Sequence, residues 1–227
     1  MSAQGRPKRE SPRTPVAMAV TSGAGSSVSD APGDEADQKS MLAYARGEAA
    51  AFDALYARHR NGVYRYLLRH CNNAGTADEL FQDVWMNVIR SRGTYEPTAR
   101  FATWLYTLAH HRIVDHWRST GQAKFVSTDA DETAGAEILA LAGSRGDQPD
   151  VRAFTGQIRD RLNTALAALP PAQRDAFLLQ QESGLSLSEI AALTGVGIET
   201  VKSRLRYAGA RLRAALIELR EASADEH

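Results

Sequence analysis

Apolar side chains recur every three or four residues along most of this chain, which is the spacing of amphipathic helices. No stretch alternates apolar and polar residues in the way that a half-buried strand does. We therefore predict an all-α fold. The first ordered block is expected to start near Ser40, and the expected helices cover residues 52–67, 76–89, 100–117, 158–169, 172–183, 187–193 and 198–212.

Three local signals mark where some of these helices begin or end. Thr76 and Glu79 have the spacing of a capping box, which predicts a helix that starts at Thr76. Ser186 and Glu189 repeat that spacing and predict a second capped helix. Gly195 separates two short helical stretches and suits a turn that needs a positive φ angle.

Composition divides the chain into segments of different character. The first 39 residues are rich in Ser, Gly, Pro and Ala and contain no aromatic residue, so we expect them to be disordered. A central segment has little periodicity and holds 7 acidic against 4 basic residues in 119–160, which favours a flexible acidic linker with helical character only at 136–142. The chain is therefore expected to form two small helical domains joined by a flexible linker. The predicted order is a tail (1–39), a first domain (40–118), the linker (119–156), a second domain (157–220) and a short tail (221–227).

The overall composition is that of a soluble globular protein, since 43% of the residues are hydrophobic and 24% are charged. The apolar runs are too short for a membrane-spanning helix or for the core of a signal peptide. We therefore expect a cytoplasmic protein without membrane insertion. The single cysteine, Cys71, rules out an internal disulfide.

Residues 186–212 have the pattern of a helix-turn-helix. The net charge of the chain is zero, but residues 196–220 hold 6 basic against 2 acidic residues. A helix-turn-helix places the start of its second helix in the major groove, where Lys and Arg donate to guanine. The side chains expected to face inward are Ile190, Ala191, Leu193, Ile198, Val201, Leu205 and Leu212. Those expected on the opposite face of the second helix are Glu199, Lys202, Ser203, Arg206 and Tyr207, while Arg204, Arg211 and Arg213 would reach phosphates.

The stretch 101–119 mixes aromatic rings, histidines and arginines within one predicted helix. Cations interleaved with rings suit single-stranded nucleic acid, because the cations hold the backbone and the rings stack on bases. Four residues of this stretch fit simple core packing instead: Trp104, Leu105, Leu108 and Val114.

The order of these parts resembles a known family. "ADELFQDVW", a loop, "FATWLYTLAHHRIVDHWR", a linker and then "LPPAQRDAF…LSLSEIAALTGVGIETVKSRLR" are similar to a bacterial RNA polymerase sigma factor of the extracytoplasmic-function group. The resemblance covers about residues 41–118 and 157–215. It implies promoter-specific transcription initiation, with core RNA polymerase and promoter DNA as partners and an anti-sigma factor as a regulator. It implies no cofactor and no catalysis.

The resemblance also assigns roles by position. The polar face of the second predicted helix is similar to the surface that binds core polymerase, and it consists of Asp78, Glu79, Gln82 and Asp83. The loop and the third helix are similar to the part that melts the −10 element and holds a flipped base. The positions assigned to −10 DNA are Ser91, Tyr95, Trp104, Tyr106, Leu108, His111 and Arg112. The positions assigned to the −35 duplex are Lys202, Ser203, Arg204, Arg206, Tyr207 and Arg211.

His111 departs from the family pattern, which often has asparagine there. A neutral imidazole offers one donor and one acceptor in a geometry different from that of an amide. The identity of the captured base, and hence the −10 sequence, therefore cannot be inferred from family members that have asparagine at this position.

Alternative functions have less support from the residues. No metal is expected, because the possible ligands lack the spacing of a metal site. These candidates are His110, His111, Asp115 and His116, which His59, His70 and Cys71 could join. The chain has neither a phosphate-binding glycine loop nor a nucleophile elbow, so we expect no enzyme. The remaining alternative is a helix-turn-helix regulator whose first domain dimerises or binds a ligand.

Overall fold

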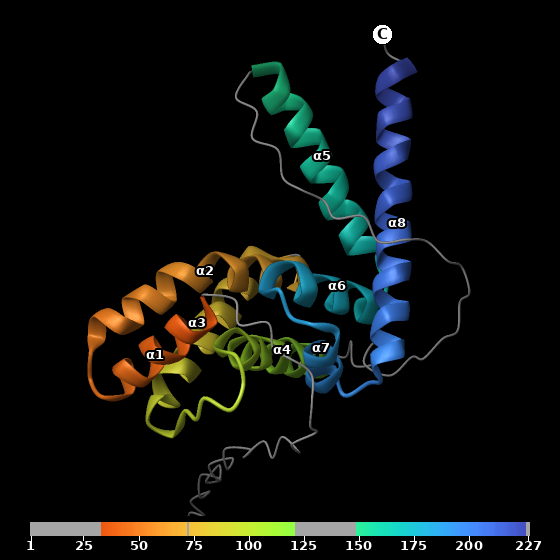
Figure 1. Ribbon diagram of the computed structural model, residues 1–227. Coiled ribbons are helices and arrows are strands. Elements are labelled where there is room, and N and C mark those ends of the chain that lie inside the picture. Colours follow the sequence, from red (N-terminus) through yellow and green to blue (C-terminus); the bar gives the residue numbers. More distant parts are fainter. Residues whose placement is uncertain (1–32, 72, 121–148, 226–227) are drawn as a thin grey trace, which may run out of the picture. The chain divides into compact units, whose positions relative to one another are not determined.

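The computed structural model describes residues 33–71, 73–120 and 149–225 (Figure 1). These residues form eight α-helices and one 3-10 helix and contain no strand, so the predicted all-α fold is confirmed for them. The predicted linker up to residue 148, its stretch at 136–142 and residues 1–32 lie outside the described residues. No helix in the described ranges combines the length and the apolar character needed to cross a membrane.

The first domain consists of four α-helices: α1 (Asp34–Ala45), α2 (Ala49–Cys71), α3 (Ala74–Arg90) and α4 (Phe101–Ser119), with the 3-10 helix η1 (Arg92–Thr94) before α4. The predicted helix over 52–67 is contained in α2, and α1 is a separate helix before it, since Gly47 adopts a φ of 103° between the two. Such an angle is open mainly to glycine.

Helix α1 begins at Asp34, inside the segment expected to be disordered. Its two buried carboxylates explain the difference. Asp34 forms an ion pair with Arg100, and Asp37 contacts both Arg58 and His59. These contacts join distant parts of the chain, so the hydrophobic pattern of 34–39 alone gives no sign of them.

Helix α3 begins before the predicted capping box. Asn73 is its N-cap, and the Asn73 side-chain oxygen accepts a hydrogen bond from the backbone N–H of Thr76 at 3.1 Å. The prediction that Thr76 caps this helix was therefore wrong. Asn is as good an N-cap as Thr, and the chain uses the earlier of the two.

The second domain consists of α5 (Pro149–Ala168), α6 (Pro171–Ser183), α7 (Leu187–Thr194) and α8 (Ile198–Asp225). Helices α5 and α8 are in contact, and Figure 1 shows them meeting near the end of α5 and diverging toward the start of α5. Helix α5 begins within the predicted linker, and α8 continues through most of the predicted C-terminal tail. Ile198 was expected to face inward but is 45% exposed, because it is the first residue of α8.

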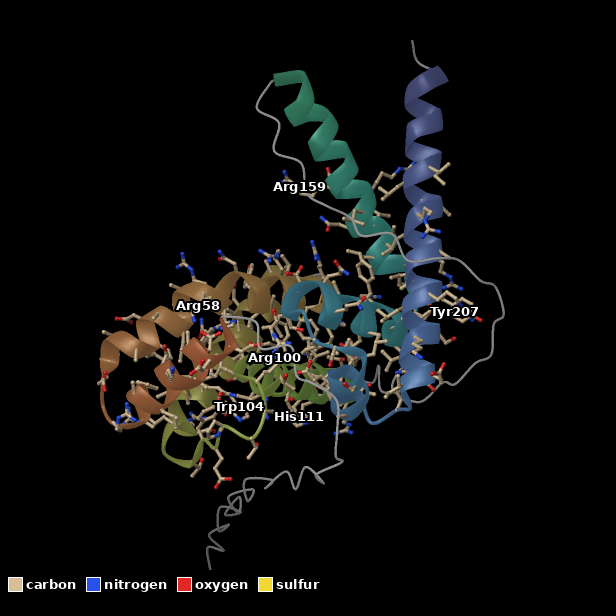
Figure 2. The ribbon with its side chains drawn as sticks, in the orientation of Figure 1. Arg58, Arg100, Trp104, His111, Arg159 and Tyr207 are labelled. Carbon is tan, nitrogen blue, oxygen red and sulfur yellow. The ribbon has the colours of Figure 1, made fainter. Side chains whose placement is uncertain are left out.

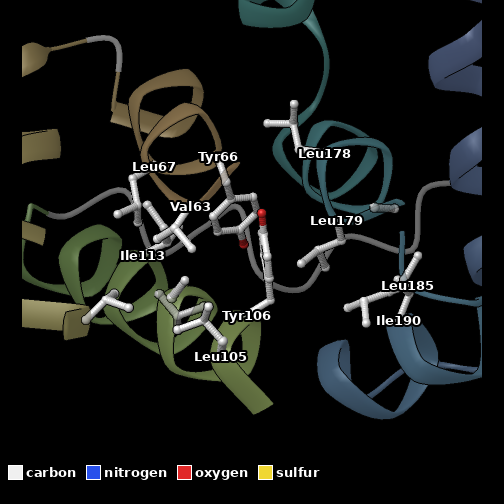
Figure 3. Packing of buried hydrophobic residues seen from close by; sticks show 14 of the residues in the cluster. Val63, Tyr66, Leu67, Leu105, Tyr106, Ile113, Leu178, Leu179, Leu185 and Ile190 are labelled. Atoms are coloured by element: carbon white, nitrogen blue, oxygen red, sulfur yellow. The ribbon is translucent and has the colours of Figure 1, made fainter. Parts of the chain in front are cut away.

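The two domains pack against each other within one compact unit. Helix α6 of the second domain contacts α2 and α4 of the first. Figure 3 shows Leu178 and Leu179 of α6 in the same buried cluster as Tyr66, Leu105 and Tyr106 of the first domain. One continuous apolar core therefore extends through both domains.

Candidate nucleic-acid interface

The helix-turn-helix is held by local signals at each end of α7. Ser186 caps the helix with both hydrogen bonds of the predicted box, since its side chain accepts from the Glu189 N–H and the Glu189 side chain accepts from the Ser186 N–H. Gly195 ends the helix at a φ of 71°, as predicted. Val201 and Leu205 are buried and fix the rotation of α8 against the domain, which leaves the opposite face of α8 outward.

The outward face of α8 carries the residues assigned to the −35 duplex. Lys202 is exposed, and its ammonium group donates to Glu199 at 2.7 Å. The guanidinium of Arg206 lies over the ring of Tyr207, 5.1 Å from its centroid. Arg211 is exposed, whereas Ser203 and Arg204 are half-buried. The structure thus brings this set together on one helix, with the charge of Lys202 partly offset by Glu199.

The outer face of α3 carries the four residues assigned to polymerase binding, and all are exposed: Asp78, Glu79, Gln82 and Asp83. The inner face of α3, including Val84 and Trp85, is buried. Met86 follows on the same outward stripe, one turn beyond Gln82 and Asp83, and is 43% exposed. Sequence reasoning missed Met86, although an apolar residue at that spacing on a polar face was the available signal.

The residues assigned to −10 DNA fall into two groups by exposure. His111 is exposed, and Ser91, Trp104, Leu108 and Arg112 are half-buried. Figure 2 shows Trp104 and His111 both on α4. Burial lowers the pKa of His111, and the neighbouring His110 lowers it further, so His111 is neutral near pH 7. A neutral His111 can offer one donor and one acceptor to a base.

The two tyrosines of the same set are buried. Tyr95 is 8% exposed and packs against Trp104 at a ring separation of 5.0 Å, and burial raises the pKa of Tyr95 to about 12. Tyr106 is 2% exposed, and its hydroxyl donates to the backbone carbonyl of Glu182 in α6 at 2.9 Å. In this arrangement neither ring is open to a base.

A buried polar cluster lies where α6 meets the first domain, and sequence reasoning missed it. Asp175 of α6 accepts a hydrogen bond from the Tyr66 hydroxyl at 2.7 Å. Its carboxylate also lies 3.2 Å from Nδ1 of His110 and 3.3 Å from Nε2 of His70. Burial would raise the pKa of Asp175, but contacts with the two histidines hold that pKa well below its usual range. A charged carboxylate inside an apolar core is tolerated only with such partners.

Three of the histidines considered as metal ligands contact carboxylates: His70 and His110 contact Asp175, and His59 contacts Asp37. The described residues contain no group of three or more His, Cys, Asp or Glu side chains arranged to hold a metal ion. Cys71 is a half-buried free thiol at the end of α2, and burial raises the pKa of Cys71 to about 11.

Comparison with family models gives two matches in order along the chain. Residues 55–122 match the model of Sigma-70 region 2, and residues 159–212 match that of Sigma-70, region 4. The first match contains α3 and α4, and the second contains the helix-turn-helix.

Two curated proteins are similar over nearly their whole length. The RNA polymerase sigma factor CarQ of Myxococcus xanthus is 34% identical over 180 residues, which cover 79% of this chain and 97% of CarQ. The ECF RNA polymerase sigma factor RpoE of Cereibacter sphaeroides is 32% identical over 186 residues, which cover 79% of this chain and 97% of RpoE.

Two solved structures share the fold. CnrH in complex with the cytosolic domain of CnrY has a TM-score of 0.56 at 20% identity, covering 81% of this chain and 98% of that one. The sigma factor RpoE in complex with the anti-sigma factor NepR from Bartonella quintana has a TM-score of 0.53 at 24% identity, covering 73% of this chain and 96% of that one.

Proposed function

This chain belongs to the extracytoplasmic-function group of the sigma-70 family of RNA polymerase sigma factors. We propose which of its surfaces bind core polymerase, the −10 element and the −35 element during promoter-specific initiation. The first domain (40–118) binds core polymerase and the −10 element, and the second domain (157–220) binds the −35 element. A simple helix-turn-helix regulator leaves the match of the first domain to region 2 without an explanation.

Polymerase binding is assigned to the outer face of α3. The exposed carboxylates of Asp78, Glu79 and Asp83 present a negative surface that suits a basic helical partner. Met86 adds an exposed apolar contact on the same stripe, which desolvates on docking and adds affinity.

Duplex reading is assigned to the outward face of α8. Lys202 and Arg206 supply donors for guanine edges, and Tyr207 holds the Arg206 guanidinium in place by stacking beneath it. Arg211 and Arg204 supply cations for phosphates.

Strand capture is assigned to α4 and the loop before it. Trp104 and His111 provide a ring and a hydrogen-bonding edge, with Ser91, Leu108 and Arg112 around them, and Tyr95 and Tyr106 join after a rearrangement. Unstacking a base costs a few kcal/mol, which stacking on these rings and hydrogen bonds to its edge can offset. Holding one strand shifts the duplex toward the open form without covalent chemistry, so the protein needs no catalytic group and no cofactor.

We also propose an anti-sigma factor as the regulatory partner and the cytoplasm as the compartment. The solved RpoE of similar fold is bound to the anti-sigma factor NepR, and CnrH is bound to the cytosolic domain of CnrY. The proposal extends these partnerships to this chain, whose own partner has to be found by experiment.

The observation that carries the function is the pair of domains in order, with the cationic face of α8 following the acidic face of α3. The test is transcription from a random promoter library by purified core polymerase with this protein. Enrichment of two spaced motifs, lost in Lys202→Ala/Arg206→Ala but kept in Arg161→Ala on α5, is the expected result. Transcripts no more selective than those of core polymerase alone would reject the function.

A further inference from the structure

We propose that the contact between the two domains is a closed state of the free protein, held by three carboxylates of the second domain, and that this state masks Tyr106 of α4 until it opens. We call Asp175, Glu182 and Glu189 the carboxylate latch. They are spaced seven residues apart along α6 and the first turn of α7. The existence of the latch is independent of the proposed function, whereas the masking of strand capture rests on it.

Asp175 forms the buried part of the latch. It is 4% exposed, and the three groups around it, Tyr66, His70 and His110, all belong to the first domain. The second domain therefore buries a charge whose partners lie on the other side of the contact. A buried charge without partners is costly, so the carboxylate is stable in only one docking position.

Glu182 forms the second part of the latch, one residue before the end of α6. Its carboxylate accepts from Nε of Arg65 at 2.8 Å and also contacts the guanidinium of Arg69. The Glu182 side chain is 6% exposed, so water does not replace these partners while the domains remain in contact. Two arginines on successive turns of α2 thus form ion pairs with one carboxylate of α6.

Glu189 forms the third part of the latch. The Thr103 hydroxyl of α4 donates to Glu189, and the Arg100 guanidinium lies 3.5 Å from the same carboxylate. Arg100 also donates to the backbone carbonyl of Gly184 at 3.2 Å. Glu189 is at the same time the residue that completes the cap of α7, so the latch connects directly to the helix-turn-helix.

The closed state covers Tyr106, a residue assigned to the −10 strand. Its hydroxyl passes over α2 at Gly62 to reach the Glu182 carbonyl. A Cβ atom built on Gly62 would lie 2.7 Å from the Tyr106 hydroxyl oxygen and 3.2 Å from the Glu182 carbonyl oxygen. Gly62 therefore permits a contact among α2, α4 and α6 that any larger side chain would obstruct.

The polar groups of the contact suit a state that opens. The latch groups are ionic or hydrogen-bonding, so water can replace their partners once the domains separate. Buried ionic pairs add little net stability compared with apolar packing, but they specify one arrangement. The latch thus defines how the domains close without making closure irreversible.

The first test measures the distance between the domains in the free full-length protein. In a Cys71→Ala background, cysteines replace the exposed residues Asp53 of α2 and Asn163 of α5 and carry spin labels for pulsed electron paramagnetic resonance. We expect one narrow distance population in this background. Asp175→Asn and Gly62→Ala each raise the ratio of open to closed molecules roughly tenfold or more, since the loss of a partnered buried charge or a steric obstruction acts on the closed state alone.

The matched control is Gly209→Ala, a glycine within α8 whose added Cβ meets no atom within 4 Å. It leaves the distance distribution unchanged. Alanine favours a helix more than glycine does, so opening in Gly62→Ala cannot be attributed to a weaker α2. Far-UV circular dichroism checks that each variant is folded. Distances unchanged in both Asp175→Asn and Gly62→Ala would overturn the latch.

The second test measures masking with a fluorescent, random-sequence single-stranded 12-mer DNA as the probe. Gly62→Ala, which changes no charge, binds the probe several-fold more tightly than the wild type, and Gly209→Ala does not. If Gly62→Ala opens the domains but binds the single-stranded probe with wild-type affinity, the proposed masking of Tyr106 is wrong. The proposed function is judged separately, by the promoter library with core polymerase.

Discussion

At the residue scale, Asp175 affects the protonation of His110, one of the two imidazoles that it contacts. Burial alone would lower the pKa of His110, but the Asp175 carboxylate raises that pKa above its ordinary value near 6.5. A histidine with a raised pKa contributes stability that is fully present below pH 6.5 and is lost as the pH rises through its folded pKa. His110 and Asp175 therefore hold each other most firmly on the acidic side of neutrality.

We predict opposite titration behaviour for two adjacent histidines. In a nuclear magnetic resonance pH titration, the His110 ring titrates above 6.5 and the His111 ring below it, because His111 is partly buried beside a cationic neighbour. In Asp175→Asn the pKa of His110 falls, since the carboxylate that raises it is gone. A His110 pKa that is unchanged in Asp175→Asn would show that the carboxylate is not its partner in solution.

A second residue-scale prediction separates base reading from phosphate binding on α8. Arg206→Ala is expected to weaken promoter binding by about 1–3 kcal/mol and to relax preference at one base pair. Arg211→Ala should weaken binding to all sequences similarly and reduce the salt slope by about 1. Competition binding of the holoenzyme to specific and random duplexes measures both. Equal losses on both duplexes in Arg206→Ala would mean that this residue contacts only phosphate.

At the scale of elements, helix ends were predictable where one residue type decides them. The Ser186 box and the left-handed glycines at 184 and 195 lie as expected, because capping and positive φ depend on local chemistry. The start of α1 was not predictable, since Asp34 and Asp37 find partners only after α2 and α4 pack. Helix α3 is capped by Asn73, three residues before the predicted cap Thr76, because either residue type can cap a helix and the local pattern did not distinguish them.

Gly195 allows a direct measurement of this local chemistry. Gly195→Ala places a Cβ at a φ of 71° and should lower the free energy of unfolding by about 1–2 kcal/mol. Gly209→Ala, in the interior of α8, should raise it by up to about 1 kcal/mol. Urea denaturation followed by circular dichroism compares the two variants. A stabilising effect of Gly195→Ala would mean that the turn relaxes to an ordinary angle.

At the scale of the whole molecule, the sequence predicted two domains but not their contact. The −10 residues were identified by resemblance and chemistry, and Trp104 and His111 are at least partly exposed as that role needs. Tyr106 is buried because α6 covers it. The sequence of 101–119 gives no indication that α6, which lies much later in the chain, packs against this helix. Asp175 was missed for the same reason, since its partners come from α2 and α4.

The shared core predicts that the domains unfold together. Leu179 of α6 is fully buried, so Leu179→Ala should cost about 2–5 kcal/mol. All three tryptophans belong to the first domain, yet their fluorescence should report this loss in the second. Urea midpoints from fluorescence and circular dichroism shift together. A fluorescence midpoint that stays at the wild-type value would show that the domains unfold independently.

The guanidinium of Arg100 contacts two carboxylates from distant parts of the chain. Arg100 binds Asp34 near the start of the first helix and also approaches Glu189 at the entrance to the helix-turn-helix. Asp34 contacts Nε and Glu189 lies near a terminal nitrogen, so loss of the Asp34 contact would leave Arg100 bound only to the second domain, through Glu189 and the Gly184 carbonyl. The charge of Arg100 is thereby shared between the start of α1 and the start of α7, two segments that lie far apart in the sequence.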